Sequence, residues 1–109
     1  VIIQGVSHPE GSHTLRSTVH GAGRVMSRKA ATGDKKKGLS GAVSERAMMK
    51  WVSEAGVVLK GAGVDEAPQC YKRLPEVLEH HKNTIKVLHT LKPIGVAMAG
   101  PDVRDPYKD

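Results

Sequence analysis

The pattern of apolar and polar positions divides the chain into short elements. The apolar run Val1–Ile3 predicts a short buried strand over residues 1–5. After a polar loop, residues 15–19 are expected to return as a second strand that delivers His20 at its end. The clearest amphipathic stretch runs from Ala42 to Ala55, where apolar residues recur at helical spacing and Gly56 marks the stop. Its stripe consists of Val43, Ala47 and Trp51, with Met48 and Val52 beside it.

The remaining segments predict an irregular mixture of helices and strands. A helix is expected from Gly23 to about Ala31, with its first turn at the glycine turn that follows His20. Thr32–Gly41 holds three glycines and three consecutive lysines, which predicts an exposed loop insert. Because no regular βαβ rhythm is present, the fold class is predicted to be α+β, with irregular sheet and helix layers. The other expected elements are a strand at 57–59, a brief helical turn that Asp65 caps and Pro68 limits, a helix from Pro75 to about His81, strands at 85–91 and 94–98, and a polar tail at 101–109.

Length and composition indicate one small domain or a piece of a larger one. The chain has 109 residues, of which 39% are hydrophobic, but it has no Phe and one Trp, so any core relies on aliphatic side chains. It begins at Val1 with an apolar run that has nothing before it to pair with. We therefore expect residues 1–109 to be one segment of a longer protein, without an internal repeat or a second domain.

The charge balance favours a polyanionic partner, although solubility alone also explains it. Seventeen Lys and Arg residues against eleven Asp and Glu residues give a net charge of +6. Aromatic residues are too few for a base-stacking platform, so any RNA contact rests on phosphate charge. The single Cys70 excludes an internal disulfide and fits a reducing, cytoplasmic setting. No apolar run approaches the length needed to span a membrane.

The string from His20 to Arg28, His-Gly-Ala-Gly-Arg-Val-Met-Ser-Arg, carries the candidate chemistry. Its two glycines leave the backbone beside the histidine open to a bulky anion. Arg24 and Arg28 are four residues apart, so on a helix they would share a face and either bind phosphate or form surface ion pairs. The spacing leaves His20 open as a nucleophile, an acid or base, or a structural residue of the turn.

Three blocks together resemble the C-terminal portion of the RtcB family of tRNA-splicing and RNA-repair ligases. The first is the string from His20 to Arg28, and the blocks occur in the family's order between about Ser17 and Gly100. The other two are Asp65-Glu66-Ala67-Pro68 with Tyr71-Lys72, and Leu91-Lys92-Pro93-Ile94-Gly95-Val96. The resemblance implies that the chain is the C-terminal part of a single RtcB-like ligase domain.

The resemblance implies a GTP- and manganese-dependent ligase. Such an enzyme joins RNA ends bearing a 3′-phosphate or 2′,3′-cyclic phosphate, such as tRNA halves or broken RNA, to 5′-hydroxyl ends. Matched residue by residue, the nucleophile that becomes guanylylated falls on His20, and the adjoining nucleotide-binding turn falls on Gly21, Ala22 and Gly23. Tyr71 matches a tyrosine near the guanine nucleotide. Arg24 is the candidate for a contact to phosphate or the RNA backbone.

Three departures from the family keep other functions open. One is the Thr32–Gly41 segment, a variable insertion whose three lysines either are solvated or contact the RNA backbone. The family's metal ligands, a cysteine, an aspartate and several histidines, lie upstream of the matched region, and Cys70 is expected to be a small buried hydrophobe. Many members end in a lysine–glycine pair that contacts the nucleotide, whereas residues 96–100 contain no lysine. Lys108 would substitute for it, or guanine recognition differs. The alternatives are a non-catalytic RNA-binding relative and a purely structural role for His20.

Overall fold

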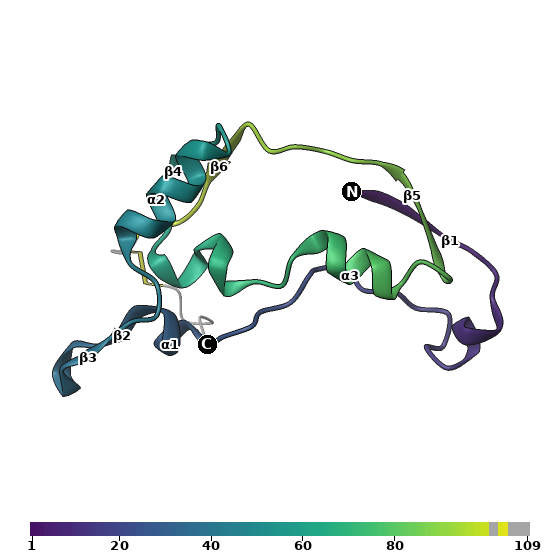
Figure 1. Ribbon diagram of the computed structural model, residues 1–109, viewed down its shortest axis with the longest axis horizontal. Coiled ribbons are helices and arrows are strands. Elements are labelled where there is room, and N and C mark those ends of the chain that lie inside the picture. The colour runs from purple at the N-terminus through teal and green to yellow at the C-terminus, as the bar shows by residue number, and fades with distance from the viewer. Residues whose placement is uncertain (101–102, 105–109) are drawn as a thin grey trace. The chain divides into compact units, whose positions relative to one another are not determined.

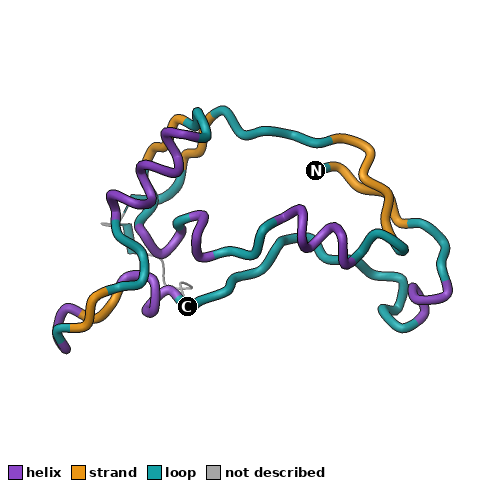
Figure 2. The backbone as a smooth tube through the Cα atoms, viewed as in Figure 1, coloured by secondary structure: helices purple, strands orange, loops and turns teal. Residues whose placement is uncertain are grey.

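The computed structural model describes residues 1–100, 103 and 104, and it combines short helices with three small two-stranded sheets (Figures 1 and 2). This mixture confirms the predicted α+β class. The chain forms two compact units, the first comprising Val1–Gly23 and Lys72–Lys92 and the second comprising Arg24–Tyr71 and Pro93–Asp109. Lys108 lies outside the described residues. In the described part of the chain, no helix has the length and apolar character that crossing a membrane requires.

The first unit is built on one antiparallel strand pair and one helix. Strand β1 (Ile2–Gly5) pairs with β5 (Ile85–His89), so that Gly5 lies opposite Ile85 (Figure 1). Helix α3 (Leu74–His80) begins with Pro75 in its first turn, where a missing N–H costs no helical hydrogen bond. The predicted strands at 1–5 and 85–91 are therefore confirmed with shorter bounds, and the helix at Pro75 is confirmed with both ends one residue earlier. The expected burial of the first strand is wrong, since β1 is mostly exposed.

The strand predicted at residues 15–19 is wrong. Leu15 and Arg16 have φ angles of 53° and 56°, so the chain passes through the left-handed region. The Arg16 N–H donates to the carbonyl of Gly11 at 2.7 Å, which closes a turn on the preceding residues. Leu15 gains no burial there, since it is 89% exposed. The apolar residues Leu15 and Val19 suggested a strand that the structure does not contain. Strand β1 pairs with β5 instead, which lies about eighty residues further along the chain.

The second unit contains two helices, a small hairpin and a parallel strand pair. Strands β2 and β3 pair in antiparallel fashion, and β4 pairs with β6 in parallel fashion, which confirms the strands predicted at 57–59 and 94–98. The 3₁₀ turns Val64–Glu66 and Pro68–Cys70 follow β4. In chain order the elements are α1 (Arg28–Thr32), β2 (Gly33–Asp34), β3 (Leu39–Ser40), α2 (Glu45–Glu54), β4 (Val58–Lys60) and β6 (Gly95–Ala97).

Helix α2 confirms the clearest sequence prediction and corrects its buried face. The Ser44 hydroxyl caps the helix by accepting a hydrogen bond from the Ala47 N–H at 3.1 Å. Met48 and Val52, four residues apart, are buried, whereas Trp51 remains 50% exposed. The stripe is therefore centred one position away from the predicted one. The core of this unit consists of Ala31, Val43, Met48, Val52, Ala67 and Cys70.

The helix predicted from Gly23 is wrong over its first turn. Arg24 forms an isolated antiparallel bridge with Tyr71, and the Val25 N–H donates to the carbonyl of Cys70 at 2.8 Å. Helix α1 starts only at Arg28, because the Ser27 hydroxyl accepts from the Ala30 N–H at 3.0 Å and caps it there. Arg24 and Arg28 therefore do not share a helical face.

Residues 33–40 form a hairpin, where the sequence predicted an exposed loop or mobile insert at Thr32–Gly41. Asp34 lies opposite Leu39 and Gly33 opposite Ser40, with the three lysines in a 3₁₀ turn between the strands. A Cβ atom on Gly33 would lie 2.3 Å from the carbonyl oxygen of Leu39, so only glycine fits this close approach. The lysines at the tip are exposed, as predicted.

Replacing Gly33 with alanine is expected to open this hairpin, and Gly38→Ala is the matched control. Both glycines have positive φ angles, 78° and 67°, but a Cβ on Gly38 meets nothing within 4 Å. Strain from φ should cost each variant about 1 kcal/mol, and the clash should cost Gly33→Ala about 1–3 kcal/mol more. Urea denaturation of both variants measures the difference. Equal loss of stability in the two variants would contradict the close packing at Gly33.

Candidate functional site

His20 is an exposed residue of the first unit, at the end of the loop that follows the Leu15–Arg16 turn. Gly21 and Gly23 are also exposed, and Ala22 is partly buried. Among the described residues, none holds the imidazole of His20 by a hydrogen bond. The backbone of the turn is fixed instead, since the Lys72 N–H donates to the carbonyl of Gly23 at 2.9 Å. The imidazole therefore stands on an anchored turn with its ring open to a ligand.

The glycine turn does not lead directly into a helix, contrary to the sequence prediction. Because α1 begins at Arg28, its N-terminus and dipole do not lie at Gly21–Gly23. What remains is an exposed stretch of backbone without bulky side chains beside His20. The roles of His20 as nucleophile and of Gly21, Ala22 and Gly23 as nucleotide contacts stay predictions.

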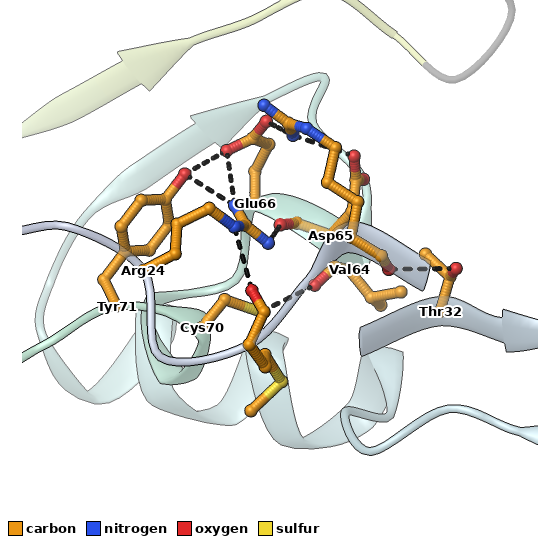
Figure 3. Close-up of polar contacts among 9 residues, drawn as sticks. Arg24, Thr32, Val64, Asp65, Glu66, Cys70 and Tyr71 are labelled. Atoms are coloured by element: carbon orange, nitrogen blue, oxygen red, sulfur yellow. Dashed lines mark hydrogen bonds and ion pairs between the residues drawn. The ribbon is translucent and has the colours of Figure 1, made fainter. Parts of the chain in front are cut away.

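Arg24 lies in the second unit, where protein groups hold its guanidinium on several sides (Figure 3). Its Nε donates to the carbonyl of Met26 at 3.1 Å, and its Nη2 donates to the carbonyl of Asp65 at 2.6 Å. Its Nη1 donates to the Tyr71 hydroxyl at 3.0 Å, and the guanidinium carbon lies 4.9 Å from the centre of the Tyr71 ring. These bonds use three of the five guanidinium N–H groups. The contact of Arg24 with phosphate stays a prediction.

Glu66 is the acceptor on which the neighbouring polar side chains converge. It accepts hydrogen bonds from Arg28 and from the Tyr71 hydroxyl, and its Oε2 lies 3.6 Å from Nη1 of Arg24. Asp65 adds a second carboxylate, whose Oδ2 accepts from Nη1 of Arg28 at 3.1 Å. We call Arg24, Arg28, Asp65, Glu66 and Tyr71 the Glu66 cluster. Figure 3 shows the side chains of Arg24, Glu66 and Tyr71 turned toward one another.

The Glu66 cluster balances two positive charges with two negative ones at low exposure. The side chains of Asp65 and Glu66 are 8% and 15% exposed, and neither guanidinium side chain is more than about a quarter exposed. Charges in such surroundings are retained because each has an opposite partner and directed hydrogen bonds. Of the two options for Arg28, the ion pair is confirmed, although it is partly buried and not on the surface.

Asp65 and Glu66 have roles that the sequence analysis missed. Asp65 was expected to cap a helical turn, but the 3₁₀ turn Val64–Glu66 has Gly63 at its cap position and no side-chain cap bond. The carboxylate of Asp65 faces Arg28 instead, and Pro68 lies in the first turn of a second 3₁₀ segment, Pro68–Cys70, that was not predicted. One feature of the sequence could have indicated these roles: the two carboxylates lie between the apolar residues Val64 and Ala67. If that segment packs into the core, its carboxylates need cationic partners.

Cys70 is a core residue, which confirms its expected burial. It is fully buried in the apolar cluster of the second unit, and its thiol lies 3.5 Å from the carbonyl oxygen of Val64. The next residue, Tyr71, packs partly buried against the same cluster and carries the bridge to Arg24. The core thus holds the segment that anchors the chain just after the glycine turn.

The described residues do not offer a manganese site. They contain no group of three or more His, Cys, Asp or Glu side chains arranged to hold a metal ion. Glu66 and Asp65 are occupied by arginines, and the ring of His8 has a structural use, since its Nδ1 accepts from the Glu10 N–H at 3.2 Å. No step of a reaction can be assigned to a metal held by these residues.

Comparison with known proteins identifies the family. The family model of the tRNA-splicing ligase RtcB matches residues 1–99, a stretch that includes His20, the glycine turn and the whole Glu66 cluster. No curated protein and no solved structure matches the chain. Since the family match covers most of the sequence, the chain belongs to the RtcB family of tRNA-splicing ligases.

Proposed function

We propose that this chain carries the guanylyl-transfer residue of an RNA ligase. In this proposal the ligase uses GTP and manganese to join an RNA 3′-phosphate or 2′,3′-cyclic phosphate end to a 5′-hydroxyl end. The observation that carries the proposal is the family match over residues 1–99, which includes an exposed histidine on an anchored glycine turn. Family membership supports RNA ligation as the activity, and the chemistry of the residues supports His20 as the covalent carrier.

The first step forms a covalent bond between His20 and GMP. A neutral ring nitrogen of His20 donates its lone pair to the α-phosphorus of GTP, and the bond from that phosphorus to the bridging oxygen breaks. Pyrophosphate leaves with the electron pair of the broken bond, and the ring proton passes to solvent. Exposure of the ring and the small neighbours Gly21 and Ala22 support this step, since they leave room for a triphosphate.

The later steps transfer the guanylyl group and close the RNA. An oxygen of the RNA 3′-phosphate attacks the guanylyl phosphorus, and the bond from phosphorus to His20 breaks. The RNA 5′-hydroxyl then attacks the activated 3′-phosphorus and loses its proton to solvent. The bond from that phosphorus to the GMP oxygen breaks, which forms the phosphodiester and releases GMP. Tyr71 is proposed to lie near the guanine nucleotide, and Arg24 is proposed to contact phosphate.

Manganese would neutralise charge on the phosphate oxygens. Because the described residues do not form a site for it, we propose that its ligands belong to another part of the ligase. We place the reaction in the cytoplasm, since a chain with one cysteine needs no oxidising compartment.

The proposal predicts that the whole protein joins RNA of one end chemistry only. With GTP and manganese, it should join a 3′-phosphate end to a 5′-hydroxyl end, because the guanylyl group activates a terminal phosphate. The matched control is the same RNA pair with a 3′-hydroxyl and a 5′-phosphate, which offers no 3′-phosphate to activate. Gel analysis of the products measures joining. Joining of the control pair, or no joining of the first pair, would overturn the proposal.

The second candidate is a non-catalytic RNA-binding relative. The absence of lysine from residues 96–100 and the net charge of +6 favour it. It predicts salt-sensitive RNA binding by the whole protein with no joined product and no covalent nucleotide.

A further inference from the structure

The tip of the β2–β3 hairpin concentrates positive charge that the described residues do not compensate. Lys35, Lys36 and Lys37 form one exposed 3₁₀ turn, and none of them forms an ion pair within residues 1–100, 103 and 104. Four other basic residues of the same unit do have acidic partners: Arg24 and Arg28 in the Glu66 cluster, Lys29 with Asp34, and Lys50 with Glu54. We call the three lysines the basic tip.

The nearest carboxylate supports the shape of the tip and leaves its charge in place. Oδ1 of Asp34 accepts from the backbone N–H of Lys36 at 3.1 Å and so caps the 3₁₀ turn. Oδ2 of Asp34 lies 3.5 Å from the ammonium of Lys29. Because this carboxylate already has a cationic partner at the base of the hairpin, no carboxylate among the described residues compensates the three ammonium groups at the tip.

The hairpin holds the basic tip in a defined position within its unit. The strands pair at Gly33–Ser40 and Asp34–Leu39, and the Gly38 N–H donates to the carbonyl of Lys35 at 3.3 Å. Figure 1 shows the hairpin reaching out beyond α1, away from α2. A fixed projection loses less conformational entropy on binding than a loose loop does.

We propose that the basic tip is a docking surface for the phosphate backbone of RNA, separate from the chemistry at His20. The choice of RNA as the polyanion rests on the proposed function. Lysine ammonium groups are compact point charges that contact phosphates without reading bases, so the tip binds RNA irrespective of sequence. In a 3₁₀ turn three successive side chains point in three directions, so one strand contacts two of the three lysines at a time.

The test is RNA binding by the whole protein and by its triple variant Lys35→Ala/Lys36→Ala/Lys37→Ala. A short single-stranded RNA is titrated over a series of salt concentrations, without GTP and with a chelator so that no joining occurs. Each phosphate contact contributes about 0.7 to the slope of log affinity against log salt, so loss of two contacts lowers the slope by about 1.4. The matched control, Arg46→Ala/Lys50→Ala/Lys60→Ala, removes the same charge from exposed positions of the same unit and leaves the slope nearly unchanged.

The outcomes separate this inference from the proposed function. A lower slope in the tip variant alone supports the basic tip, even if the wild-type protein joins no RNA and the proposed function fails. Equal slopes for the tip variant and the wild type, or an equal decrease in the control variant, overturn it. Anionic lipid vesicles bound in preference to RNA through the tip also overturn it. Circular dichroism of both variants confirms that the hairpin residues were changed in a folded protein.

Discussion

Replacing His20 with alanine is expected to abolish the joining of RNA while leaving the protein folded. The ring is exposed, and no described residue bonds to it, so its removal should change the free energy of unfolding by less than about 0.5 kcal/mol. Removing a covalent nucleophile, by contrast, costs on the order of 10⁶ in rate. Single-turnover joining of a 3′-phosphate RNA to a 5′-hydroxyl RNA, followed by gel electrophoresis, measures this loss.

A pre-activated RNA distinguishes loss of the nucleophile from loss of the site. If His20 acts only by carrying the guanylyl group, an RNA whose 3′-phosphate already bears GMP bypasses the residue. The His20→Ala protein should then join this RNA within about tenfold of the wild-type rate, since a tenfold change corresponds to only about 1.4 kcal/mol of barrier. Failure to join the activated RNA would assign His20 to the final step or to the structure of the site, contrary to the account.

Replacing Glu66 with alanine is expected to give the largest loss of stability. It removes the acceptor shared by Arg28 and Tyr71 and the nearest side-chain carboxylate to Arg24. Breaking a fully buried ion pair by removing one partner costs about 3–5 kcal/mol. The two guanidinium side chains are about a quarter exposed, and Arg28 would still pair with Asp65 in the variant. We therefore expect Glu66→Ala to lower the free energy of unfolding by about 2–3 kcal/mol. Urea denaturation measures it.

Glu76→Ala is the matched control for this variant. Glu76 is 71% exposed and lies 4.0 Å from Arg73 on α3, so its removal should cost less than about 0.5 kcal/mol. The loss of stability in Glu66→Gln should lie between those of Glu66→Ala and Glu76→Ala, because the amide keeps an acceptor oxygen for the Tyr71 hydroxyl but loses the charge. If Glu66→Ala is no less stable than Glu76→Ala, the Glu66 cluster does not stabilise the fold.

The sequence predicted elements whose signals are local. Helix α2 has a periodic apolar stripe and a serine at its cap, and α3 has a proline in its first turn, so both could be recognised from neighbouring residues. The prediction of a strand at 15–19 was wrong because nothing in the local pattern of apolar and polar residues indicates that Leu15 and Arg16 adopt left-handed φ angles. Pairing of β1 with β5 depends on residues about eighty positions apart, which no local pattern specifies.

The candidate site was predicted at His20 and missed at Glu66 for a related physical reason. The glycine turn beside His20 is contiguous in the sequence, so a backbone open to an anion could be predicted from neighbouring residues. The pairing of Arg24 and Arg28 with Asp65 and Glu66 arises from tertiary packing, which brings segments about forty residues apart together. Helical spacing suggested that the arginines share a face, whereas Ser27 caps α1 between them and the carboxylates bring their guanidiniums together.

The most direct measurement is to locate the guanylyl group on the protein. The whole protein is incubated with GTP and manganese, digested at a pH that preserves the phosphorus–nitrogen bond, and analysed by mass spectrometry. The account predicts GMP on the peptide that contains His20 and on no other histidine peptide, with no adduct in the His20→Ala protein. GMP on a different residue, or an adduct that persists in His20→Ala, would contradict it.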